Sequence, residues 1–185
     1  MNNKYLNDNI TALNNIKDLD EIYQRVLFDV IDCLNNGHKI IFLGNGGSAA
    51  DSSHIVSEFV AHFKFDRKSL PAISLTDNNA LITSISNDYS YEDVFKKQLE
   101  SLGNKGDILF GITTSGKSLN VLKALDYAKT IGIKPILVTG NNDIPNIEYS
   151  IKIPSNETSI IQNMYMIIFH MLCLDVDEYY NKHRN

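Results

Sequence analysis

The sequence predicts an α/β fold, in which a five-stranded parallel sheet is flanked by helices and preceded by an N-terminal helical segment. Short apolar runs recur along the chain, and segments with apolar residues at helical spacing separate them. Turns rich in glycine, or in serine and threonine, join two of these runs to the helices that follow. Because strands that alternate with helices pair in parallel, the sheet is expected to carry helices on both faces.

The N-terminal segment, from about Tyr5 to Leu34, places apolar side chains one helical turn apart. A kink or short turn near Asp18–Asp20 divides it into two helices, and Asn36-Gly37 ends the second. The apolar positions are Leu6, Ile10, Leu13, Ile22, Val26, Val30 and Leu34.

The remaining elements alternate along the chain. Strands are predicted at Lys39–Leu43, Pro71–Leu75, Asp107–Ile112, Pro135–Val138 and Ile147–Ile153. Helices are predicted at Ala49–Phe63, Asn79–Ser86, Tyr91–Leu102, Ser118–Ile131 and Glu157–Tyr180. Apolar and polar residues alternate in the fifth strand, which is typical of a half-exposed strand at the edge of a sheet.

Length and composition predict a single domain, residues 1–185, with N-terminal helices at 1–36 and the α/β core at 37–185. Hydrophobic residues make up 43% and charged residues 21%, which is typical of a soluble globular protein. The formal net charge of -5 argues against nucleic-acid or membrane partners, although local backbone amides can still bind an anionic small molecule.

The two cysteines, Cys33 and Cys173, have no metal-binding spacing and are expected to be buried thiols. The N-terminus, Met1–Ile10, has no signal-peptide pattern, and the most apolar run, Met164–Leu174, is too short to span a bilayer. A cytoplasmic location is therefore expected.

The first glycine-rich turn, Gly44–Ser48, joins a strand to a helix. Its glycines let the backbone approach an anion, and the helix that follows supplies unpaired N–H groups. Ser48 adds a hydroxyl donor. The sequence therefore predicts an oxyanion site, with a tight turn that binds no ligand as the alternative.

The same turn also fits a dinucleotide-binding pattern, because Gly44, Gly46 and Ala49 match G-x-G-x-x-A. That motif requires an acidic residue about 20 positions further on, at the end of the second strand. Asp77 lies well beyond that distance, and Asp66 falls in a loop. The dinucleotide interpretation is the weaker one.

A second loop, Thr113–Ser118, follows the third predicted strand. With Gly111, it matches the nucleotide P-loop pattern G-x-x-x-x-G-K-[ST]. Gly111 lies in an apolar run and is expected to belong to the strand, so the loop proper is a run of hydroxyl and amide donors that suits a phosphate monoester. A P-loop would need a carboxylate for Mg²⁺, for which Asp77 is the available residue. Two such loops on one sheet predict a ligand with a phosphate and several hydroxyl groups.

His54 and Glu58 lie four residues apart on the predicted helix after the first loop, so they share a face. Such a pair can bind a metal ion or place a base beside an imidazole, but it is also a common surface ion pair. Gln162 and His170 lie on the last helix, where His170 is surrounded by apolar residues. A lone histidine in that setting is more often a core residue, so these residues alone leave its role open.

Taken together, the motifs resemble the phosphoheptose isomerases, which are sugar-isomerase (SIS) domain enzymes. The resemblance covers nearly the whole chain, and the motifs occur in the family's order. They are Gly44-Asn45-Gly46-Gly47-Ser48, His54-x-x-x-Glu58, Asn87-Asp88, Thr114-Ser115-Gly116-x-Ser118 and Gln162-x7-His170.

The resemblance implies an isomerase that converts sedoheptulose 7-phosphate to a glycero-manno-heptose 7-phosphate for lipopolysaccharide or capsule synthesis. It also implies a homotetramer with shared sites, formed by the N-terminal and last helices, and one zinc ion per subunit. The implied zinc ligands are His54, Glu58, Gln162 and His170.

By the same resemblance, Glu58 and His170 are the acid–base residues. The phosphate would be held by Ser48, Thr113, Thr114, Ser115 and Ser118. The rest of the substrate would contact Asn45, Gly46, Gly47, Glu58, Asp88 and Gln162.

Two positions depart from the family pattern. His62 occupies the place of an arginine in the run Ala61–Lys64, and Ser159 replaces an aspartate three residues before Gln162. Both positions face the substrate in relatives, so they bear on the choice of sugar. A non-catalytic SIS-fold adaptor of the replication-initiator-binding type, or a phosphosugar sensor, is the alternative; the presence of Glu58 and His170 favours the enzyme.

Overall fold

The computed structural model describes residues 2–142, 144 and 147–183. Five parallel strands form one sheet in the order β2-β1-β3-β4-β5, which confirms the predicted architecture. The strands are β1 (Ile40–Gly44), β2 (Ala72–Ser74), β3 (Ile108–Ile112), β4 (Lys134–Thr139) and β5 (Ser150–Lys152). β5 lies at an edge of the sheet, as the alternation of its residues predicts.

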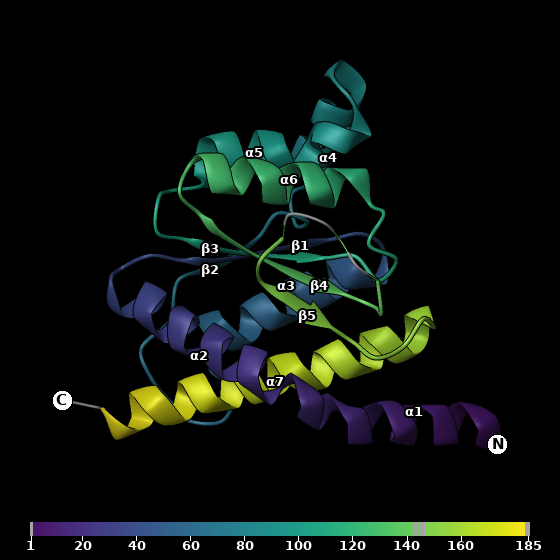
Figure 1. The fold of residues 1–185 in the computed structure, drawn as a ribbon. Helices are drawn as coiled ribbons and strands as arrows, with labels where there is room; N and C mark the ends of the chain where they lie inside the picture. The colour runs from purple at the N-terminus through teal and green to yellow at the C-terminus, as the bar shows by residue number, and fades with distance from the viewer. Residues whose placement is uncertain (1, 143, 145–146, 184–185) are drawn as a thin grey trace.

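Helices cover both faces of the sheet (Figure 1). One face carries α1 (Asn3–Asn15), α2 (Asp20–Asn35), α3 (Gly47–Val60) and α7 (Thr158–Lys182). The other face carries α4 (Asn79–Asp88), α5 (Val94–Leu102) and α6 (Leu119–Thr130). A short 3-10 turn, Ile16–Leu19, separates α1 from α2 where the sequence predicts a break.

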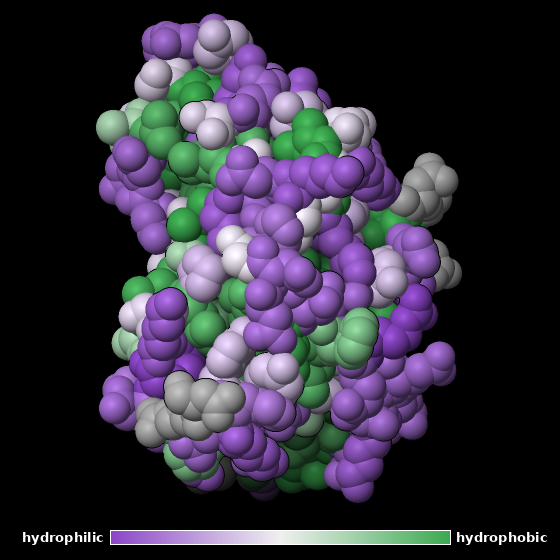
Figure 2. Space-filling model, turned by 90° about the vertical axis from the view of Figure 1, so that its left-hand side faces the viewer, coloured by the Kyte–Doolittle hydropathy of each residue, from purple (hydrophilic) through white to green (hydrophobic). Residues whose placement is uncertain are grey.

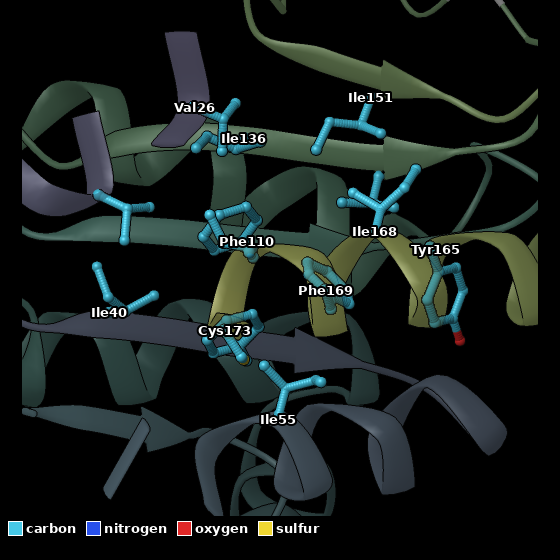
Figure 3. Packing of buried hydrophobic residues seen from close by; sticks show 14 of the residues in the cluster. Val26, Ile40, Ile55, Phe110, Ile136, Ile151, Tyr165, Ile168, Phe169 and Cys173 are labelled. Atoms are coloured by element: carbon cyan, nitrogen blue, oxygen red, sulfur yellow. The ribbon is translucent and has the colours of Figure 1, made fainter. Parts of the chain in front are cut away.

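The core beneath α7 is aromatic. The rings of Phe42 and Phe110 stack at 4.9 Å, and Phe169 of α7 meets each of them edge-on at 5.6 Å. Figure 3 shows Phe169 next to Phe110, with the ring of Tyr165 at the end of the cluster and its hydroxyl pointing away from the other aromatic rings. This packing fixes the position of α7 relative to β1 and β3.

Both cysteines are buried free thiols, as predicted. Burial raises the pKa of Cys33 to about 12 and also raises the pKa of Cys173. A thiol held neutral in this way is a poor nucleophile and metal ligand.

The surface on the side where α7 ends is mostly hydrophilic (Figure 2).

α7 is long and apolar enough to cross a membrane by length and composition, so the apolar stretch of the sequence is longer than Met164–Leu174 suggests. However, half of the apolar stretch of α7 is buried inside the protein. Tyr165 and Phe169 are fully buried in the core. The apolar character of α7 is therefore explained by its packing against the sheet.

Some helix boundaries differ from the prediction. α3 ends at Val60 rather than Phe63, because the backbone N–H groups that follow it turn toward a carboxylate of α7. The helix predicted at Tyr91–Leu102 is divided into a 3-10 turn, Tyr91–Asp93, and α5. The first difference arises from contacts with a residue far along the chain, which a local pattern does not contain.

Candidate active site

Two strand-to-helix loops leave the sheet side by side. Gly44, the last residue of β1, is paired with Ile112, the last residue of β3. The first loop, which leads into α3, and the second loop, Thr113–Ser118, therefore begin at the same height. Ligands bind at this carboxyl edge in open parallel sheets.

The first loop touches α7. A side chain at Gly47 would place its Cβ 2.5 Å from Nε2 of Gln162, so only glycine fits there without displacing the amide. Gly46 has a positive φ of 57°, which also suits glycine. Gln162 is thus brought to the loop, while its implied roles in binding zinc and substrate stay predictions.

Ser48 is buried beneath this loop. Its hydroxyl lies 3.0 Å from the hydroxyl of Tyr165, which donates to Oδ2 of Asp51 at 2.6 Å. Burial raises the pKa of Tyr165, and the hydrogen bond to Asp51 raises it further, so the phenol keeps its proton. The part of Ser48 in phosphate binding stays a prediction.

The second loop is closed by its own hydroxyl and amide groups. Thr113 Oγ1 donates to Ser118 Oγ at 3.0 Å, and the N–H of Gly116 donates to the carbonyl of Thr113 at 3.0 Å. Ser115 Oγ accepts from the N–H of Lys117 at 3.2 Å. α6 begins directly after Ser118, so its N-terminus points at the loop.

Gly111 belongs to β3, as expected, and not to the loop. A Cβ at this position would lie 2.9 Å from the side chain of Leu125. The glycine therefore serves the close packing of α6 on the strand. This explains the match to the P-loop pattern without a nucleotide.

The structure also brings together side chains from α3 and α7. His54 Nε2 lies 3.3 Å from Oε1 of Glu58, and the rings of His54 and His170 meet edge-on at 5.4 Å between centroids. The ring of Phe63 stacks on His170 at 5.3 Å between centroids. An imidazole, a carboxylate and a second imidazole thus lie together, with Gln162 on the same helix as His170.

These residues fit zinc by donor type, because imidazole nitrogen and carboxylate oxygen are its usual ligands besides thiolate. Within the part of the chain that the structure describes, no three His, Cys, Asp or Glu side chains are arranged as a complete metal site. His54, Glu58 and His170 would have to turn toward a common point to bind an ion.

Asn45, predicted to touch the sugar, is held by two residues that sequence reasoning missed. Its amide forms a reciprocal pair with Asn120 of α6, with both hydrogen bonds at 2.9 Å. Tyr91 donates to Asn45 Oδ1 at 2.8 Å. Their only sequence signals are a polar residue in the first turn of a helix and one of several tyrosines.

The other predicted positions lie around these groups. Asp88 is exposed at the end of α4, three residues before Tyr91, and accepts a hydrogen bond from Asn87. His62 is exposed after α3. Ser159, in the first turn of α7, bonds to the hydroxyl of Tyr5 on α1 and lowers the pKa of that phenol.

Comparison with known proteins gives a consistent result. The family model described as "SIS domain" matches residues 4–140. A "Probable phosphoheptose isomerase" from Thermoplasma volcanium is 45% identical over 95% of this chain and 92% of the relative. A "Phosphoheptose isomerase" from Aneurinibacillus thermoaerophilus is 40% identical over 95% and 94%.

Among solved structures, a phosphoheptose isomerase from Francisella tularensis superimposes with a TM-score of 0.90 at 33% identity. The match covers 95% of this chain and 96% of that protein. It therefore includes α7, which lies beyond the residues that the family model matches.

Proposed function

Since the chain belongs to the phosphoheptose isomerases of the SIS-domain family, we propose that it converts sedoheptulose 7-phosphate to D-glycero-D-manno-heptose 7-phosphate. The protein is an aldose–ketose isomerase. The observation that carries this function is the group formed by His54, Glu58 and His170 on α3 and α7, two helices that meet at the first loop.

The phosphate is assigned to the second loop. Thr113–Ser118 offers hydroxyl and backbone donors at the N-terminus of α6, where a phosphate dianion is favoured. The first loop starts one strand away, so the sugar chain can extend from the phosphate toward α3 and α7.

The reaction moves protons without any net gain or loss of atoms. A base removes a proton from C1 of the ketose while the oxygen on C2 gains one, which gives the enediol. Return of a proton to C2, with loss of the proton from the C1 hydroxyl, gives the aldose. We assign the carbon-bound proton to Glu58 and the oxygen-bound protons to His170.

Zinc is part of the proposal. His54, Glu58, Gln162 and His170 would hold it, and a bound ion would polarise the substrate carbonyl. A carboxylate has two oxygen atoms, so one oxygen of Glu58 can bind the ion while the other accepts the proton.

An adaptor or a sensor is the less favoured function. Such a protein needs no acid–base pair, whereas Glu58 and His170 are both present and both adjoin His54. The product would feed the synthesis of nucleotide-activated heptose for lipopolysaccharide or capsule.

We also infer a homotetramer in the cytoplasm. Apolar residues of α1 are exposed in the single chain, with Leu6 and Ile10 each 48% exposed. Such residues are typical of a surface that another subunit covers. Free buried thiols suit a reducing compartment.

The test is an NMR assay of the purified protein with sedoheptulose 7-phosphate in D₂O. An aldose anomeric signal with deuterium on the carbon next to the carbonyl is expected. Glu58→Gln should lower turnover by at least about 100-fold, because general acid–base catalysis contributes that much. Turnover close to wild type in the variant would contradict the role of Glu58, and no turnover by wild type with added zinc would contradict the substrate.

A further inference from the structure

The amide of Asn45 is part of a chain of hydrogen bonds whose directions can be worked out. Two amides, Asn45 and Asn120, face each other, and Asn120 is only 3% exposed. The hydroxyl of Tyr91 reaches the pair from the segment after α4. We call this chain of hydrogen bonds between Tyr91, Asn45 and Asn120 the relay; its three residues come from different parts of the chain.

One backbone group determines which atom donates and which accepts in each of these hydrogen bonds. The N–H of Val121 can only donate, and it lies 2.9 Å from Oδ1 of Asn120. The other atom of the Asn120 amide must then be the nitrogen, which donates to Oδ1 of Asn45 at 2.9 Å. In return, Nδ2 of Asn45 donates to Oδ1 of Asn120 at 2.9 Å. The remaining contact of Asn45 Oδ1 must therefore be a hydrogen bond that Tyr91 donates, at 2.8 Å.

A count of donors and acceptors shows what is left for a ligand. A side-chain amide has two lone pairs on oxygen and two N–H groups. Oδ1 of Asn45 already accepts from Asn120 and Tyr91, so both lone pairs are used. One N–H is given to Asn120. Asn45 thus has a single N–H to offer, and no acceptor.

We propose that Asn120 and Tyr91 are positioning residues that make Asn45 a one-way hydrogen-bond donor to an acceptor oxygen of the substrate. The identity of that substrate rests on the proposed function, but the relay itself does not. Without Tyr91, Oδ1 of Asn45 would have a free lone pair, and the amide could also accept a hydrogen bond from a sugar hydroxyl.

Tyr91→Phe removes one hydrogen bond from the relay and leaves the ring. Tyr91 is 54% exposed, so little packing changes. We expect KM for sedoheptulose 7-phosphate to rise about threefold to tenfold, which corresponds to one hydrogen bond, with kcat within about twofold. Tyr89→Phe is the matched control, because Tyr89 is also exposed and contacts Lys97 instead of Asn45; its KM should not change.

A double-mutant cycle tests whether Tyr91 acts through Asn45. In an Asn45→Ala background, Tyr91→Phe should change the dissociation constant of sedoheptulose 7-phosphate, measured by calorimetry, by less than about twofold. An equal effect in both backgrounds would overturn the relay. Because this cycle measures binding, it remains valid if the protein binds the sugar phosphate but does not isomerise it.

The relay is also tested without any substrate. In ligand-free protein labelled with ¹⁵N-asparagine, the side-chain signals of Asn45 should shift in Tyr91→Phe and stay in place in Tyr89→Phe. Unchanged Asn45 signals in Tyr91→Phe would overturn the proposal whatever reaction the protein catalyses.

Discussion

Glu58 is fixed at both its backbone and its side chain. Its carbonyl accepts a hydrogen bond from Arg67 at 2.9 Å, and Oε1 lies 3.3 Å from His54. The side chain is 21% exposed, so the carboxylate lies near the surface of the protein and within reach of a ligand. This arrangement suits the proposed role of Glu58, in which one carboxylate oxygen would bind the zinc ion and the other would exchange a proton with the substrate.

His54→Ala removes one of the four proposed zinc donors. We expect the affinity for zinc to fall by more than about 100-fold, since even residues outside the ligand sphere contribute up to that factor. Metal content after dialysis, measured by mass spectrometry, gives the result without an activity assay.

His38→Ala is the control, because His38 packs against Gly106, near the amino end of β3. If His54→Ala and wild type hold zinc equally well, His54 is not a ligand.

At the scale of single residues, local spacing predicts His54 and Glu58 because they are one helical turn apart. It does not predict that Ser48 bonds to Tyr165, which lies 117 residues further along the chain. Nor does it predict the pair of Asn45 and Asn120. These contacts depend on how α3, α6 and α7 pack, and a single sequence carries no pattern for that packing.

At the scale of elements, the end of α3 is fastened to α7 by a buried ion pair. Arg67 donates through Nε to Asp177, and its Nη1 donates to the carbonyl of Phe59 at 2.8 Å. The second oxygen of Asp177 accepts three backbone N–H groups, from Phe63, Lys64 and Phe65. These contacts of Asp177 and Arg67 fix the position of the segment that follows Glu58.

Asp177→Asn leaves Arg67 buried without its charge partner. We expect the free energy of unfolding to fall by about 3–5 kcal/mol, as in other buried pairs broken on one side. Urea denaturation at neutral pH measures the change. Asp126→Asn is the control, because Asp126 is 71% exposed and its pair with Lys129 should contribute about 1 kcal/mol or less.

The same residue predicts a pH dependence. Burial alone would raise the pKa of Asp177, but the N–H groups of Lys64 and Phe65 and the charge of Arg67 outweigh it and lower the pKa. Because the folded-state pKa is depressed, the carboxylate stabilises the protein above the unfolded value and loses this effect as the pH falls through the folded-state pKa. The stability difference between wild type and Asp177→Asn should therefore shrink below pH 3.8. A difference that is constant down to pH 2 would contradict this account.

The elements themselves are largely predictable, since apolar periodicity places all five strands and most helices. The errors lie at the boundaries of helices and strands, because contacts with residues far along the chain can end an element that the local pattern would continue. α3 stops at Val60 because Asp177 binds the next N–H groups, and β5 is limited to Ser150–Lys152 although the alternation begins at Ile147.

At the scale of the molecule, α7 connects the parts. It packs on α1, α2 and α3 (Figure 1). It also carries Gln162, which reaches the first loop, and His170, which meets His54 of α3. Where α1, the turn after it and α7 meet, an apolar groove of about 660 Å³ remains, lined by Leu13, Ile16, Ile22, Ile151, Ile167 and Met171 among others. The groove adjoins the exposed apolar side chains of α1. The groove and these side chains together form the proposed subunit contact.

Ile10→Glu tests that contact, because a charge placed in an apolar interface must lose its hydration. We expect wild type to sediment at four times the 20.8 kDa mass of the chain, and the variant as a smaller species with reduced turnover. Leu102→Glu is the matched control: Leu102 is 41% exposed on α5, across the sheet from α1, and its substitution should leave the tetramer intact. If wild type sediments at 20.8 kDa, the assembly is wrong while the isomerase assignment stands. If both variants dissociate, the contact is not confined to α1, and the shared site would have to be sought on the α5 face instead.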